Sequence, residues 1–204
     1  METATHEGGW ALWFTGLPGC GKSTIARPVH TALTGQGRDV TLLVMDERRK
    51  AYFPRPAYSP EERARAYELF VHEAAELAAQ GRGVILDATA HRLAVRNQAR
   101  ALIPRFAEVL VRCPLVEAMR REASRTQLHH KGYVMPGMYE KALERRRSGQ
   151  PVPGLGEVVG VDVAYEENFA AECVLDALRP VAENVAVVLT FLDGWLPGWV
   201  GGAA

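Results

Sequence analysis

Five short apolar segments, separated by longer amphipathic or polar stretches, dominate the hydrophobic pattern of the chain. Continuous runs of branched aliphatic and aromatic side chains predict buried β-strands. We expect such strands at residues 10–15, 39–45, 83–88, 107–113 and 172–177. Apolar positions with helical spacing fill the intervening segments. They predict helices that begin near Lys22, Ser59, Leu93 and Pro114, and a last one after Pro180.

The clearest helix signal is the segment that begins SPEER at residue 59. Ser59 is a good N-cap, Pro60 suits the first helical position, and Glu62 completes a capping box. Gly81 ends the apolar pattern of this helix. The capping residues therefore predict where the helix begins as well as that it forms.

Strands that alternate with helices are typical of βαβ units. Because the strand segments are hydrophobic throughout, we expect an α/β fold in which helices cover both faces of a parallel sheet. The whole chain, residues 1–204, is predicted to be one domain. A long irregular region lies at about 127–168 and contains an amphipathic segment at 138–147. Long insertions in compact α/β domains are usually functional, so this region is predicted to be a lid.

The turn between the first strand and the first helix has the sequence GLPGCGKS, a complete G-x-x-x-x-G-K-[ST] motif. Its glycines allow backbone N–H groups to surround a phosphate, and the helix adds the positive end of its dipole. Lys22 is predicted to bridge the β- and γ-phosphates of ATP, and Ser23 to bind Mg²⁺. The predicted nucleotide-binding residues of this P-loop are Gly16, Leu17, Pro18, Gly19, Cys20, Gly21, Lys22, Ser23 and Thr24.

Charge and composition narrow the class of function. The chain has 24 basic and 24 acidic residues, so its formal net charge is zero, which argues against nucleic-acid or membrane binding by bulk electrostatics. Three well-separated cysteines and the absence of a signal-like N-terminus favour the cytoplasm. No N-K-x-D guanine-binding sequence occurs. A kinase for a small molecule, with ATP and Mg²⁺, is therefore the predicted class.

A phosphoryl-transfer site also needs an acidic residue near the γ-phosphate. Asp46 follows the second predicted strand and Asp87 ends the third. The carboxyl ends of parallel strands surround the ligand crevice, so both aspartates are expected to face the P-loop as catalytic residues. Either aspartate alone could instead cap a following turn.

The strings GLPGCGKSTIA, MDERR, YSPEER, RNQAR, RCPL, GMYEKA and GVDVAYEE occur in this order, and together they resemble the adenylylsulfate kinase family. That family transfers phosphate from ATP to adenosine 5′-phosphosulfate (APS), which gives 3′-phosphoadenosine 5′-phosphosulfate (PAPS) in sulfate assimilation. The resemblance implies that Asp46 lies near the acceptor hydroxyl and the metal, with Ser23 as the other metal ligand. It further implies acceptor contacts by Arg49, Tyr58, Arg63 and Lys141, and an ATP contact by Arg121.

The acceptor half departs from the family pattern. The family's I-S-P-F-R loop after the third strand is ATAHRL here, at residues 88–93, and its adenine-stacking aromatic residue is Val158. A kinase for another small alcohol, such as a nucleoside, sugar or antibiotic, is therefore an alternative. A module that senses ATP without transfer is a third reading. The last helix is predicted to pack in the core, or to form a homodimer face with the apolar tail around Trp195 and Trp199.

Overall fold

The computed structural model describes residues 8–55, 59–124 and 135–196. Its centre is a five-stranded parallel sheet with the order β2-β3-β1-β4-β5. The strands are β1 (Trp10–Thr15), β2 (Val40–Val44), β3 (Gly83–Asp87), β4 (Phe106–Arg112) and β5 (Cys173–Asp176). The predicted α/β fold with a parallel sheet is confirmed.

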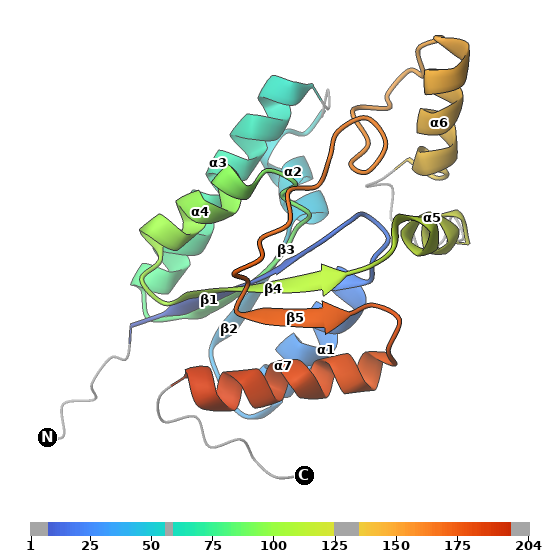
Figure 1. Cartoon of the computed structure of the whole chain (residues 1–204). Coiled ribbons are helices and arrows are strands. Elements are labelled where there is room, and N and C mark those ends of the chain that lie inside the picture. Colours follow the sequence, from blue (N-terminus) through green and yellow to red (C-terminus); the bar gives the residue numbers. More distant parts are fainter. Residues whose placement is uncertain (1–7, 56–58, 125–134, 197–204) are drawn as a thin grey trace, which may run out of the picture.

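Helices cover both faces of this sheet (Figure 1). They are α1 (Lys22–Gly35), α2 (Met45–Tyr52), α3 (Pro60–Ala79), α4 (Leu93–Leu102), α5 (Leu115–Ala123), α6 (Met138–Ser148) and α7 (Val181–Trp195). α3 and α4 lie on one face, α1 and α7 lie on the other, and α5 and α6 lie beyond the carboxyl ends of the strands. Among the described residues, no helix combines the length and the hydropathy that crossing a bilayer requires.

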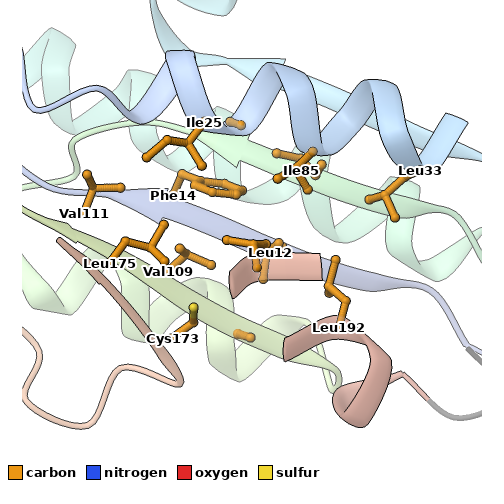
Figure 2. Close-up of a cluster of buried hydrophobic side chains, with 14 of the residues drawn as sticks. Leu12, Phe14, Ile25, Leu33, Ile85, Val109, Val111, Cys173, Leu175 and Leu192 are labelled. Atoms are coloured by element: carbon orange, nitrogen blue, oxygen red, sulfur yellow. The ribbon is translucent and has the colours of Figure 1, made fainter. Parts of the chain in front are cut away.

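The alternation of side chains along β1 builds the two cores. Leu12 and Phe14 point to the α1/α7 face, where they pack with Ile25, Leu33 and Leu192 (Figure 2). Ala11 and Trp13 point to the opposite face and join a cluster that includes Phe70 of α3. All six residues of β1 are buried, which explains why this strand reads as one continuous apolar run.

The capping signals at the start of α3 are confirmed. Ser59 Oγ accepts a hydrogen bond from the Glu62 backbone N–H at 3.2 Å, and Pro60 occupies the first turn. In contrast, the sequence did not predict α2. β2 ends at Val44, one residue earlier than predicted, and Asp46 lies in the first turn of α2 rather than at a strand end. Asp46 and Glu47 suit this position because carboxylates stabilise the positive end of a helix dipole.

The described part of the predicted lid region is α6 with the loop that follows it. Arg145 donates hydrogen bonds to the carbonyls of Leu155 (2.8 Å) and Gly156 (3.1 Å) and forms an ion pair with Asp162 (2.6 Å). Arg146 donates to Val161 O at 3.0 Å. Two of the three consecutive arginines of α6 thus bind α6 to its own loop. His129 and His130 lie outside the described residues.

Candidate active site

The P-loop is the turn from β1 into α1, and its shape depends on glycine. Gly16, Gly19 and Gly21 have φ angles of 139°, 83° and 102°, in the region that residues with a Cβ rarely adopt. A Cβ atom on Gly16 would lie 2.5 Å from the Val111 carbonyl oxygen. Gly21 is the N-cap of α1 and no side chain caps that helix. The helix therefore presents its N-terminus to a ligand anion.

Lys22 is buried at the start of α1 and its ammonium group is held by the P-loop itself. Nζ donates hydrogen bonds to the carbonyls of Gly16 at 3.1 Å and Leu17 at 3.0 Å, and contacts Cys20 Sγ at 3.8 Å. This positive charge is fixed inside the turn, where it can meet a phosphate without a large rearrangement.

Asp87 lies at the carboxyl end of β3, with 4% of its surface exposed. In the described part of the chain, its Oδ2 atom has no hydrogen-bond partner. Burial raises the pKa of the Asp87 carboxyl, while the charge of Lys22 and a hydrogen bond from Ser23 act in the opposite direction. A buried carboxylate oxygen without a partner, beside a serine hydroxyl, suits a magnesium ion.

Magnesium needs few protein ligands. Among the described residues, no three His, Cys, Asp or Glu side chains gather into a metal site. Mg²⁺ is commonly bound through one or two protein ligands, substrate phosphates and water. The residues around Ser23 and Asp87 therefore fit the predicted metal.

A cavity of about 510 Å³ joins the P-loop to the predicted acceptor residues. Lys22, Ser23 and Asp87 line it together with Asp46, Arg49 and Arg63. Asp46 is exposed at this cavity, whereas Asp87 is buried. Apolar side chains of the α6 region form another part of its wall, namely Met135, Pro136, Met138, Leu155, Val158 and Val159. The structure thus brings both predicted aspartates and two predicted arginines into one cavity.

The two arginines of this cavity have acidic neighbours. Arg49 is buried, and its Nη1 lies 3.9 Å from Glu62 Oε1. Arg63 donates a hydrogen bond to the Glu157 carbonyl at 2.7 Å and lies 4.0 Å from the carboxylate of the same residue. The second contact connects α3 with the loop after α6 across the cavity.

Arg121 lies on the other side of the P-loop, in a smaller cavity of about 260 Å³ that Thr24 also lines. Its guanidinium group donates to the carbonyls of Cys20 at 3.4 Å and Ala177 at 2.8 Å, and pairs with Glu117 at 2.6 Å. Arg120 and Arg121 hold the pKa of Glu117 at about 2. This cavity adjoins the P-loop through Gly19, Cys20 and Gly21.

Two predicted acceptor residues are not part of the described central cavity. Lys141 lines a separate groove between α5 and α6, together with side chains such as Met119 and Glu144. Tyr58 lies outside the described residues. Their roles remain predictions of the family resemblance.

Sequence reasoning missed the residues that hold the loop after β3, although the altered ATAHRL string marked the loop itself. Four consecutive carbonyls, from Ala88 to His91, each accept a hydrogen bond, two from β1, one from α4 and one from the segment before β5. In order, the donors are Trp13 Nε1 (3.0 Å), Thr15 Oγ1 (2.6 Å), the Arg96 guanidinium and the Glu166 N–H (2.8 Å). Ala88, Thr89 and His91 of this loop line the central cavity.

Known proteins of one family resemble this chain in sequence and in fold. The adenylylsulphate kinase family profile matches residues 8–176. A probable adenylyl-sulfate kinase of Archaeoglobus fulgidus is 32% identical over 167 residues, which cover 82% of this chain and 95% of that protein. The adenylyl-sulfate kinase of Paraburkholderia xenovorans is 30% identical, and the match covers 90% of this chain and 93% of that protein.

Among solved structures, the fold resembles a Mycobacterium tuberculosis APS kinase determined with AMPPNP and APS. The TM-score is 0.73 at 26% identity, and the match covers 91% of this chain and 98% of the other. Family profile, relatives and fold agree with one another. The chain therefore belongs to the adenylylsulfate kinase family, and it is an ATP-dependent kinase with a hydroxyl acceptor.

Proposed function

We propose that this protein transfers the γ-phosphoryl group of ATP to the 3′-hydroxyl of APS, which gives ADP and PAPS. The observation that carries the proposal is a single cavity that joins a complete P-loop, two aspartates and two arginines. Arginines bind phosphate and sulfate oxygens well because their planar guanidinium groups donate paired hydrogen bonds. The relatives named as adenylyl-sulfate kinases support the same acceptor.

In this proposal, the P-loop and Lys22 bind the donor phosphates. On moving from the Gly16 and Leu17 carbonyls to a phosphate oxygen, the Lys22 ammonium group would stabilise negative charge that develops during transfer. Ser23 and Asp87 would hold magnesium, because the buried Asp87 carboxylate lies beside the Ser23 hydroxyl. The metal would supply positive charge that neutralises the donor phosphates. A metal role for Asp46 beside Ser23 stays a prediction of the family resemblance.

Asp46 then serves the acceptor. It is exposed at the central cavity, in the first turn of α2, where it can accept a hydrogen bond from the acceptor hydroxyl and orient it. Arg49 and Arg63 bind the acceptor's phosphosulfate. Glu157, which contacts Arg63 in this structure, gives up that contact to the acceptor. Arg121 holds the outer side of the P-loop near the ATP base.

Product analysis tests the proposal. The protein is incubated with ATP, Mg²⁺ and APS, and the nucleotides are separated by chromatography. We expect ADP and PAPS in equal amounts. Asp46→Asn should lower kcat by about 10²-fold or more, since positioned proton acceptors contribute on that order. Glu47→Gln is the matched control, because the adjacent Glu47 pairs with Arg27 on the surface at 3.0 Å.

The second candidate function is a kinase for a different small alcohol. Two residues in the wall of the central cavity support testing this candidate as well. Val158 and His91 occupy positions where the resemblance leads us to expect aromatic residues. A panel of nucleosides, sugars and aminoglycosides is therefore assayed beside APS. Release of ADP with one of these compounds, and none with APS, would overturn the proposal.

The proposal also places the enzyme in the cytoplasm. Cys20, Cys113 and Cys173 are free thiols, and a reducing compartment keeps them so.

A homodimer stays a prediction. Exposed apolar side chains near the edge strand β5, namely Val174, Leu178 and the 91% exposed Phe169, are consistent with such a contact.

A further inference from the structure

The loop at residues 88–92 is held firmly from several elements, although no regular hydrogen-bonding ladder supports it. Besides the four carbonyl contacts, the Ala90 N–H donates to the Tyr67 hydroxyl at 2.8 Å. Ala90 itself has φ 38°, the only positive value among the described residues that carry a Cβ. Surrounding structure must fix such a backbone, and strained positions of this kind are concentrated at functional sites.

This fixed backbone places one large polar side chain at the cavity wall. His91 follows Ala90 directly and is 8% exposed. Arg63, Tyr67, His91 and Glu157 line both the central cavity and a smaller adjoining one of about 60 Å³, so they form the wall between the two. Of these two cavities, only the central one is lined by the P-loop. His91 therefore lies beside Arg63, on the wall shared with the cavity that the P-loop does not line.

The charge state of His91 suits a hydrogen bond rather than an ion pair. Burial lowers the pKa of the His91 imidazole, and the positive charges of Arg63 and Arg92 lower it further. The carboxylates of Glu157 and Glu166 act in the opposite direction. A neutral imidazole has one N–H donor and one acceptor nitrogen. Beside Arg63, the donor can bind an oxygen of an anion whose charge the arginine balances.

We infer that His91 determines acceptor specificity by donating a hydrogen bond to the anionic group that Arg63 binds. The inference rests on the proposed function in so far as that reaction places an anionic acceptor in this cavity. It goes further because the family resemblance predicts phenylalanine, not a hydrogen-bonding residue, at this position of the loop. A site built to hydrogen-bond its substrate discriminates strongly against molecules that lack the partner group.

The test compares His91→Ala, His91→Gln and His91→Phe with the wild type. Initial rates are measured with the acceptor varied at saturating ATP, and with ATP varied at saturating acceptor. We expect the acceptor KM to rise about tenfold or more in the Ala and Phe variants, the size of effect that one lost hydrogen bond to a charged group produces. The KM for ATP should stay within about twofold of wild type. Gln retains a donor and should recover most of the loss.

The acceptor in this test is APS if the wild type makes PAPS, and otherwise the compound of the panel that gives ADP. An anionic acceptor other than APS would overturn the proposed function. The His91 variants, assayed with that acceptor, would still decide the role of His91. A neutral acceptor, or no turnover with any compound, would overturn both. An acceptor KM within twofold of wild type in His91→Ala would refute the inference, as would an equal rise in the KM for ATP. His91→Phe keeps the bulk of the side chain, so it separates a lost hydrogen bond from a disturbed loop.

Discussion

The buried ion pair between Arg96 and Glu108 gives the sharpest stability prediction. The Arg96 and Glu108 side chains are 0% and 1% exposed, and Arg96 Nε lies 3.0 Å from Glu108 Oε1. Arg96 also donates to the carbonyls of Ala90 and Glu166, and its guanidinium lies over the Tyr165 ring, 5.1 Å from the centroid. One side chain thus connects α4 to β4, to the loop after β3 and to the segment before β5.

Arg96→Met keeps much of the buried volume but removes the positive charge. Glu108 is then left with the Asn168 amide, which donates to Oε2 at 2.8 Å, as its remaining side-chain partner among the described contacts. An uncompensated buried charge costs about 3–5 kcal/mol of folding stability. For a chain of this size each kcal/mol lowers Tm by about 2–4 °C, so we expect a fall of about 6–20 °C.

Urea denaturation at pH 7 measures the loss, and a double-mutant cycle identifies its cause. Because Glu108→Gln removes the charge that Arg96→Met leaves unpaired, the double variant should be more stable than Arg96→Met alone. A loss below about 1 kcal/mol in Arg96→Met would refute the reasoning, as would a double variant whose loss equals the sum of the two single losses. Either result would mean that the pair contributes no more than surface ion pairs do.

Two further substitutions test the P-loop and its buried aspartate. Burial raises the pKa of Asp87 above its ordinary 3.8, so its ionisation opposes folding at neutral pH. Asp87→Asn should therefore raise Tm of the ligand-free protein at pH 7, with the gap closing as the pH falls toward 3.8, and should abolish turnover. Gly16→Ala should lower stability by more than about 1 kcal/mol, because Gly16 has φ 139° and lies close to the Val111 carbonyl. Gly35→Ala, at an open position in α1, should be neutral or slightly stabilising.

Thermal unfolding of the ligand-free protein across a pH series checks the aspartate, and urea denaturation compares the two alanine variants. A fall in Tm at pH 7 for Asp87→Asn would mean that Lys22 and Ser23 compensate burial fully. Equal losses in Gly16→Ala and Gly35→Ala would mean that the P-loop backbone relaxes around an added methyl group.

The fold could be predicted from the sequence because its signals are local. The predicted strand at 10–15 coincides with β1, and the capping residues placed the start of α3. α2 lacks such signals. Its sequence is strongly polar, and the side chain of its N-cap residue, Val44, makes no capping hydrogen bond. The helix forms because Met45 and Arg49, one turn apart, are both buried, which only the tertiary structure determines.

The site could be predicted in part for the same reason. The P-loop residues are consecutive, and their spacing alone predicts that they bind the phosphates of a nucleotide. Arg96 looked like any arginine on an amphipathic helix, and Glu108 is a single charge inside an apolar strand. Their partnership joins positions twelve residues apart and buries both, which one sequence cannot reveal. Likewise, nothing local to His91 shows that Arg63 lies beside it.

The anchoring of the loop after β3 has a consequence for how this enzyme could evolve. Other elements bind the loop through its carbonyl oxygens, and Ala88 and Ala90 are buried in the core, whereas Thr89 and His91 line the central cavity. Every amino acid carries that carbonyl. Substitutions at Thr89 and His91 can therefore exchange the groups presented to the acceptor while the path of the chain stays the same. The backbone of the loop can therefore be kept while the substrate specificity changes. Residues 89 and 91 are the positions at which to redesign the specificity for the acceptor.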